Sequence, residues 1–168
     1  MDIASLMTAF MVWSQGVVDV WGYLGLFFIS VVGNASIIFP IPTHIVTFFF
    51  ASILNPWLVA IISAVGAAIG EVVGYVIGRG VNKATEKKRF KWLRKAEKWT
   101  DHYGVFTVIF IFALTPLPDD IAGIISGTIK YDFKKFFLAT LLGKIIMYSI
   151  IAWGGFIGIN WVLTYFGG

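Results

Sequence analysis

The sequence contains no cysteine, and its first 78 residues contain no lysine or arginine. The lack of cysteine excludes disulfide bonds and thiolate metal sites, and leaves the redox compartment open. Charged residues are also scarce, at 13% of the chain, about half the share in a typical soluble domain. Hydrophobic residues make up 58%. This composition predicts an all-α, polytopic membrane protein.

Two long apolar segments are expected to cross the membrane as helices. Residues 57–78 form a run of 22 residues with a single acidic charge, Glu71, which is long enough for a hydrocarbon core of about 30 Å. The second segment, 133–161, carries charge only at two lysines near its start and at Lys144.

Two further segments, 3–21 and 80–103, place apolar residues on one face of a helix and polar residues elsewhere. We expect amphipathic helices, the first on the outer surface of the membrane and the second, which is basic, on the anionic inner leaflet. A transmembrane span is the alternative for 3–21. Charge is the only feature of 80–103 that would favour nucleic acid, so we expect no nucleic-acid partner.

Basic residues are confined almost entirely to two stretches of the chain. Nine of the thirteen lie between Arg79 and Lys98, and three more lie between Lys130 and Lys135. Lysine and arginine concentrate in short cytoplasmic loops, so both stretches should face the cytoplasm. The predicted protein is therefore a multi-pass protein of the cell membrane with both termini outside. Its segment 105–129 must enter and leave the membrane on the same side.

Two Pro-x-Pro motifs interrupt apolar segments at 22–54 and 105–129. The four prolines, which recur at an offset of 76 residues, are Pro40, Pro42, Pro116 and Pro118. Proline breaks helices, and the two limbs of 105–129, ten and nine residues long, reach only about 14–15 Å as helix, half a bilayer. Both segments are therefore predicted to be re-entrant helical hairpins with the prolines at their tips. Each precedes a long helix, and the two units, inserted from opposite sides, form an inverted repeat typical of secondary transporters.

Ionisable and polar residues in predicted membrane segments are candidates for function because they are costly to bury. The candidates for substrate or ion binding are Asn34, His44, Glu71, Asp119, Asp120 and Lys144. Counting residues from the ends of the segments puts Glu71, Lys144, His44 and the second tip about 12–16 Å deep. We therefore expect them to meet near the middle of the membrane, with Asn34 lining the cavity.

Each of these candidates also has a purely structural explanation. Glu71 and Lys144 could form a buried ion pair that pins two helices together. Asp119 and Asp120 could cap the second half-helix, although one carboxylate suffices for a cap. His44 could be a polar tip residue whose hydrogen bonds are made by the backbone.

Glycine recurs at every fourth position of the first long helix: Gly66, Gly70, Gly74 and Gly78. Small residues let membrane helices approach closely, so we expect these glycines to be packing surfaces, with homodimer formation as the alternative. Enzyme motifs are missing from the sequence: it has no Cys–His pair, no Gly-x-Ser-x-Gly and no His-Glu-x-x-His. We therefore expect no catalytic residues, no metal site and no cofactor.

The stretches FPIP, GEVVGYVIGRG and HYGVFTVIFIFALTPLPDDIAGIISGTIKYDFKKFFLATLLGK resemble the DedA family, also called the VTT or SNARE-associated Golgi protein domain superfamily, over about residues 22–160. The resemblance implies two oppositely inserted re-entrant hairpins and the movement of lipids across bilayers. It includes translocation of polyprenyl-phosphate carriers and scrambling of phospholipids, with proton or sodium coupling proposed for bacterial members.

The chain also departs from this family. Members usually carry an arginine three residues before the second tip, where this chain has Ala113, and many carry an acid near the first tip, where it has Asn34 and His44. The basic position of LLGK is kept as Lys144.

The resulting prediction is a flippase or scramblase that moves lipid or lipid-linked phosphate headgroups. Asp119 and Asp120 would bind a coupling proton or sodium ion, and Lys144 would meet the headgroup. The alternatives are a small-solute or ion transporter on the same scaffold, and an assembly factor that transports nothing.

Overall fold

The computed structural model describes residues 22–36, 43–80, 104–115 and 120–166, without the side chains of 120 and 159–166. Within these ranges the protein is helical and contains no strand. The predicted outer helix 3–21, nearly all of the basic segment 80–103, the four tip prolines and Asp119 lie outside the described residues.

Six helices make up the described ranges. In chain order they are Gly22–Ala35, α2 (Thr43–Ile53), α3 (Pro56–Gly80), α5 (Val105–Leu114), α6 (Asp120–Thr128) and α7 (Phe133–Phe166). Among them, α3 and α7 are the two that are long and apolar enough to cross a membrane. The prediction of an all-α chain with two membrane-length helices is therefore confirmed for these residues, although α7 continues past the expected end at 161.

Both long helices begin with a side-chain cap. The Asn55 Oδ1 atom accepts hydrogen bonds from the backbone N–H of Trp57 and Leu58, at 3.0 and 3.3 Å. Asp132 caps α7 in the same way, because its Oδ1 atom accepts the N–H of Lys135 at 2.9 Å. Capping satisfies N–H groups that a helix start leaves unpaired, so these two residues fix where the long helices begin.

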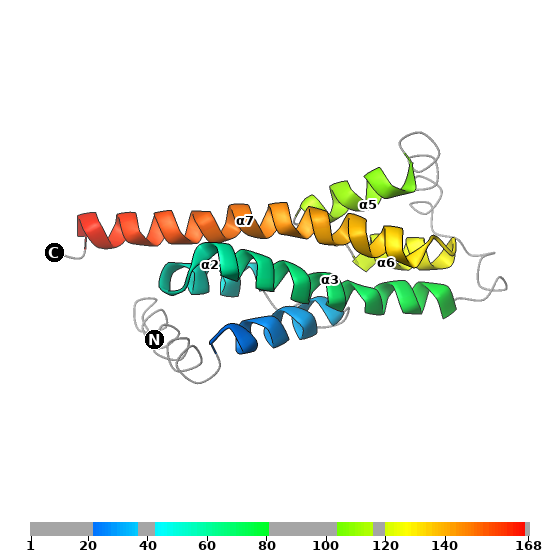
Figure 1. Cartoon of the computed structure of the whole chain (residues 1–168), viewed down its shortest axis with the longest axis horizontal. Helices are drawn as coiled ribbons and strands as arrows, with labels where there is room; N and C mark the ends of the chain where they lie inside the picture. Colours follow the sequence, from blue (N-terminus) through cyan, green and yellow to red (C-terminus); the bar gives the residue numbers. More distant parts are fainter. Residues whose placement is uncertain (1–21, 37–42, 81–103, 116–119, 167–168) are drawn as a thin grey trace, which may run out of the picture.

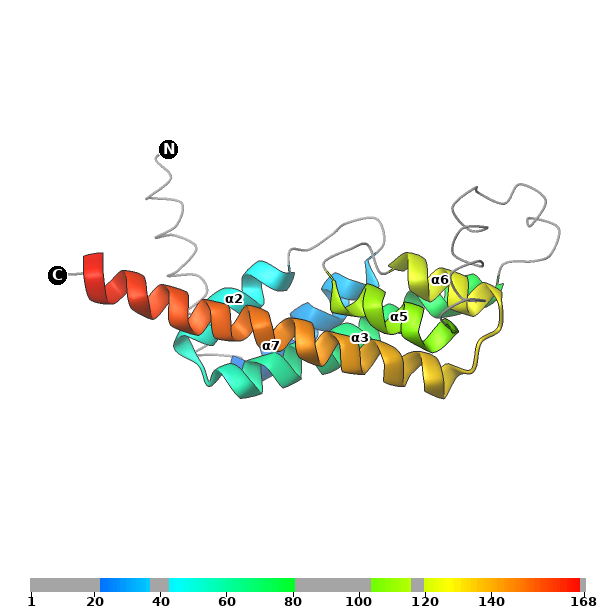
Figure 2. The same cartoon turned by 90° about the horizontal axis from the view of Figure 1, so that it is seen from above.

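Figure 1 shows α3 and α7 side by side and running in opposite directions along the length of the molecule. The Gly22–Ala35 helix and α2 lie toward the end where α3 begins, whereas α5 and α6 lie toward the end where α3 finishes (Figures 1 and 2). Each pair of short helices thus lies beside a different end of the α3–α7 pair.

The contacts between short and long helices link the two halves of the chain. The most extensive contacts of α6 are with α3, and those of α2 are with α7. Glycine makes this approach close: a Cβ atom on Gly78 would overlap the carbonyl of Ile124 in α6, and one on Gly155 would overlap the carbonyl of Phe48 in α2. The second short helix of each half is therefore held by the long helix of the other half.

Large apolar side chains cover the outside of the bundle. Trp57, Val76, Ile150 and Ile157 are among those more than half exposed. In water such a surface would be an aggregation hazard, whereas a lipid environment solvates it. The exposed surface therefore agrees with a membrane protein.

Candidate functional site

A buried ion pair joins the two long helices. The Nζ atom of Lys144 in α7 lies 3.3 Å from the Oε1 atom of Glu71 in α3, and the two side chains are 1% and 3% exposed. They are the only charged side chains that are buried among the described residues. Removing charges from water costs several kcal/mol per ion, so a pair like this is held only where each charge compensates the other.

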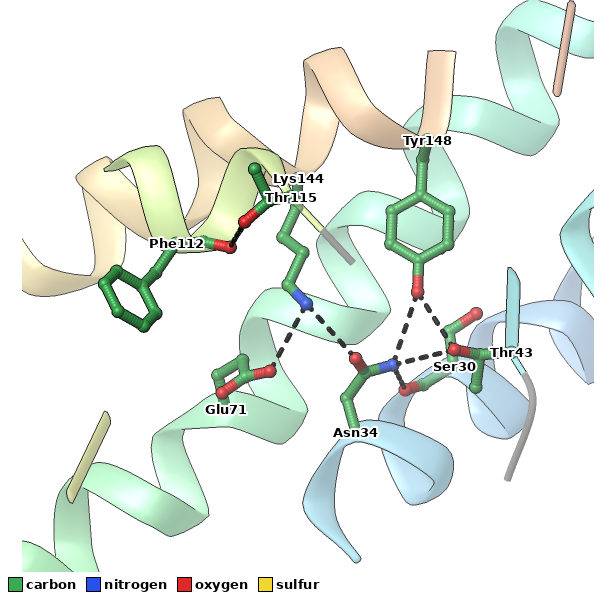
Figure 3. A network of polar contacts seen from close by, with 8 residues as sticks. All are labelled: Ser30, Asn34, Thr43, Glu71, Phe112, Thr115, Lys144 and Tyr148. Carbon is green, nitrogen blue, oxygen red and sulfur yellow. Dashed lines mark hydrogen bonds and ion pairs between the residues drawn. The ribbon is translucent and has the colours of Figure 1, made fainter. Parts of the chain in front are cut away.

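Asn34, at the end of the Gly22–Ala35 helix, extends this pair (Figure 3). Its Oδ1 atom accepts a hydrogen bond from Lys144 Nζ at 3.3 Å, and its Nδ2 atom donates to the carbonyl oxygen of Ser30 at 2.8 Å. A lysine can only donate and a carbonyl can only accept, so both contacts require the same orientation of the amide. Lys144 therefore has oxygen partners on two different helices.

A cluster of hydroxyl groups continues from Asn34 toward the Asn55 end of the molecule. The Thr43 Oγ1 and Tyr148 Oη atoms lie 3.1 Å apart, and Asn34 Nδ2 is 3.4 and 3.5 Å from them. Next along α2, Thr47 Oγ1 donates to Ser63 Oγ in α3 at 3.0 Å. These groups form a continuous buried polar chain from the ion pair into that half of the bundle.

The inner ends of the four short helices meet the long helices around this pair. Asn34 ends the first helix and Thr43 begins α2, as described above. A Cβ atom on Gly143, the residue before Lys144, would lie 2.7 Å from Ala113 near the end of α5. A Cβ atom on Gly123, in the first turn of α6, would lie 3.3 Å from the carbonyl of Glu71. The ion pair is thus the point on which both halves converge.

Of the six candidate binding residues, three are in direct contact: Asn34, Glu71 and Lys144. His44 joins them indirectly, because its ring stacks on that of Tyr148 with centroids 5.5 Å apart and planes 7° from parallel. Asp120 is the first residue of α6, but its side chain and all of Asp119 lie outside the described part of the chain.

The predicted packing glycines lie inside the bundle. A Cβ atom on Gly66 would lie 2.8 Å from the Cβ atom of Ser30, and one on Gly70 would lie 2.6 Å from the carbonyl of Val31, so both pack on the Gly22–Ala35 helix. Gly74 and Gly78 are buried as well. These faces of α3 are therefore occupied by helices of the same chain.

Sequence reasoning missed Tyr148 and Thr43, whose hydroxyls surround the amide of Asn34. A signal was present: Tyr148 lies four residues after Lys144, on the same face of the helix. Thr43 had no such signal, since a threonine beside a proline motif is a common turn residue. No group of three potential metal-binding side chains occurs in the part of the chain that the structure describes.

The arrangement suits recognition of an anion more than bond-making chemistry. An ammonium group in a dry interior will accept an oxyanion in place of a carboxylate, because either one balances its charge. Hydroxyl and amide groups next to it can donate further hydrogen bonds.

The family model for the VTT domain matches residues 41–157. This segment includes both partners of the ion pair and the helices from α2 to most of α7, while Asn34 lies just before it. No curated protein and no solved structure matches the chain.

Proposed function

Since the chain belongs to the VTT domain family, the family of the DedA membrane proteins, we propose that it moves lipid or lipid-linked phosphate headgroups across the bilayer. The observation that carries this proposal is the Glu71–Lys144 pair, buried where the two long helices pack together. A purely structural core would be cheaper to build from apolar residues. In this proposal the pair is a binding site in its resting state. The Glu71 carboxylate balances the charge of Lys144 until a phosphate group takes the place of the carboxylate.

The convergence of the short helices supports a re-entrant inverted repeat. In this proposal, Gly22–Ala35 with α2 and α5 with α6 enter the membrane from opposite sides and turn near its middle. Such broken helices are where secondary transporters bind their substrates. The positions of the basic residues orient the chain in the cell membrane with both termini outside. The packing of α2 on α7 and of α6 on α3 agrees with two equivalent halves of the chain.

Ala113 bears on the choice of substrate. The DedA family that this chain resembles usually carries an arginine at this position. Ala113 packs against Gly143, next to Lys144. Lys144 is then the cation that meets the headgroup, and a single ammonium favours one phosphate group. Phospholipids and polyprenyl phosphates both offer such a group, so we propose these two classes as substrates.

Coupling to a proton or sodium ion is assigned to Asp119 and Asp120. Asp120 begins α6, whose first turn packs against Glu71. A bound proton or sodium ion would neutralise the negative charge that these two carboxylates bring to a membrane segment.

Purified protein in liposomes that contain labelled phospholipid or labelled polyprenyl phosphate tests this function. Loss of label from the inner leaflet, in the presence of an outside quencher, measures translocation. The matched variant is Glu71→Gln with Lys144→Met, which removes both charges together and leaves neither one buried alone. We expect the wild type to translocate at least one lipid and this variant to translocate none while remaining folded. Transport by the double variant at the wild-type rate would contradict the role of the pair.

A small anionic solute is a second candidate, and the near-complete burial of the pair favours it. A site closed to lipid as well as to water fits a cargo that has no acyl chain. Uptake of labelled inorganic phosphate by the same liposomes separates the candidates, because a solute carrier would take up the phosphate and leave lipids in place.

A further inference from the structure

The α3–α7 interface is built from two facing stripes of residues spaced four apart, the spacing that lines up one face of a helix. The α3 stripe is Ser63, Ala67, Glu71, Tyr75 and Arg79, and the α7 stripe is Phe136, Thr140, Lys144, Tyr148 and Ala152. All of these side chains are buried except that of Arg79, which is exposed. The ion pair lies in the middle of both stripes.

Each partner of the ion pair is followed by a tyrosine one turn later on its own helix. Because α3 and α7 run in opposite directions (Figure 1), Tyr75 and Tyr148 lie on opposite sides of the pair. The packing agrees: Tyr75 shares a buried cluster with Phe136 and Ala139 of α7, whereas Tyr148 shares one with Ala64 and Ala67 of α3. An aromatic layer therefore separates the ion pair from each end of the bundle.

The first layer lies on the side toward Arg79. The Tyr75 ring stacks on Phe136 with centroids 4.8 Å apart. Its hydroxyl donates to the carbonyl of Tyr131 at 2.6 Å and accepts from the Nη1 atom of Arg79 at 2.9 Å. The exposed guanidinium of Arg79 thus lies directly beyond the ring, where a phosphate arriving from this side would first meet a cation.

On the side toward Asn55, the layer is Tyr148 stacked on His44. Its hydroxyl is bonded to that of Thr43 at the start of α2, and Met147 belongs to the same buried cluster. Each side of the ion pair is therefore covered by a tyrosine that stacks on a second ring.

The hydroxyl group of each tyrosine forms a hydrogen bond with a residue from the other half of the chain. Tyr75, on α3, is held by the turn between α6 and α7. Tyr148, on α7, is held by the first residue of α2. Movement of either half relative to the other would break one bond or the other.

We propose that Tyr75 and Tyr148 are the two gates that close the Glu71–Lys144 site, Tyr75 toward the Arg79 side and Tyr148 toward the Asn55 side. The structure is then the state in which both gates are shut. This inference deepens the proposed function and rests on it for the identity of the cargo. The existence of side-specific gates can be tested without any transport.

The test uses single cysteines in this cysteine-free chain as reporters of water access. Thr140→Cys reports on the Tyr75 side of the ion pair, and Ala67→Cys reports on the Tyr148 side; both positions are buried. Sealed vesicles are treated from each side with a membrane-impermeant thiol reagent. Lys134→Cys, at an exposed position near Tyr131, identifies which side is the Arg79 side.

With Tyr75→Ala, we expect the Thr140→Cys thiol to react from the Arg79 side. With Tyr148→Ala, we expect the Ala67→Cys thiol to react from the opposite side. A minor open state is typically populated to about 0.1–10%, so making it dominant should raise the labelling rate about tenfold or more. Protection of the Thr140→Cys thiol in Tyr75→Ala, from both sides, would overturn the proposal.

Two further sets of variants keep the result interpretable. Leu26→Ala truncates an equally buried side chain in the cluster with Phe50 and Val59, away from the ion pair. If it unmasks the reporters as well, labelling reflects general loosening and the gates are refuted. Tyr75→Phe and Tyr148→Phe keep the rings but lose the hydroxyl bonds, and should give smaller increases on the same sides even if the alanine variants fail to fold.

The outcomes also separate this inference from the proposed function. Side-specific labelling in a protein that moves no lipid would refute the function and leave the gates. Lipid transport with labelling that does not depend on Tyr75 or Tyr148 would refute the gates and leave the function.

Discussion

The Nζ atom of Lys144 donates to the Oδ1 atom of Asn34 over 3.3 Å, which ties α7 to the Gly22–Ala35 helix at the level where Glu71 ties it to α3. One ammonium group thereby holds three helices that are distant in sequence. The nearly complete burial of Lys144 means that the loss of either partner is not made good by bulk water.

Asn34→Leu should destabilise the protein, because it leaves Lys144 with one fewer acceptor and removes the amide that donates to the Ser30 carbonyl. Leaving a buried polar group unsatisfied costs about 1–3 kcal/mol. Thermal unfolding in detergent measures the change, with Val32→Ala, at an exposed position in the same helix, as the control. A variant as stable as the wild type would show that the hydrogen bonds of the amide add nothing to the stability of the fold.

Removing one charge of the ion pair should be worse than removing both. Lys144→Met alone leaves the charge of Glu71 buried without the lysine that balances it. The loss of one partner from a buried pair costs about 3–5 kcal/mol. Adding Glu71→Gln should restore most of that stability. Unfolding of the two single variants and the double variant in detergent gives the coupling between them. Additive losses would indicate that the two charges do not depend on each other.

Gly70→Ala should destabilise the protein, whereas Gly80→Ala should be neutral or slightly stabilising. The new Cβ atom at position 70 would lie 2.6 Å from the backbone oxygen of Val31, while nothing lies within 4 Å at position 80. Overpacking of this kind costs about 1–3 kcal/mol. Equal melting temperatures for both variants would contradict the close packing of α3 on the Gly22–Ala35 helix.

A topology with both ends of 105–129 in the cytoplasm predicts that Lys134→Cys is protected in intact cells. An impermeant maleimide should label it only after the membrane is opened. A cysteine at position 2, near the N-terminus, should react without opening. Rapid labelling of position 134 from outside would show that the second pair of short helices crosses the membrane, and the inverted repeat would be abandoned.

Asp119→Asn together with Asp120→Asn should abolish transport while the protein still folds. The amides keep the size of the side chains and an oxygen that can cap the helix, and only the charge and the titratable proton are lost. Liposome transport at several pH values and sodium concentrations measures the effect. Wild-type transport should depend on one of these ions. A double amide that transports at the wild-type rate would identify the two carboxylates as helix caps.

Local rules were enough to predict the membrane class and the helices. Scarce charge and long apolar runs require helices in lipid, since each backbone group must find its partner within its own segment. The starts of α3 and α7 follow from Asn55 with Pro56 and from Asp132, which act on neighbouring residues only. The depth shared by Glu71 and Lys144 follows from a constant rise per residue.

The partners across the bundle depended on the tertiary structure. A rise per residue gives the depth of a side chain but not the rotation of its helix relative to the others, so the contact of Lys144 with Asn34 does not follow from the sequence alone. Tyr148 and Thr43 are 105 residues apart and meet only because α2 packs on α7. The packing between the two halves results from glycines, whose missing side chains leave room for another backbone. Which backbone fills that room is decided by the shapes of all the helices together.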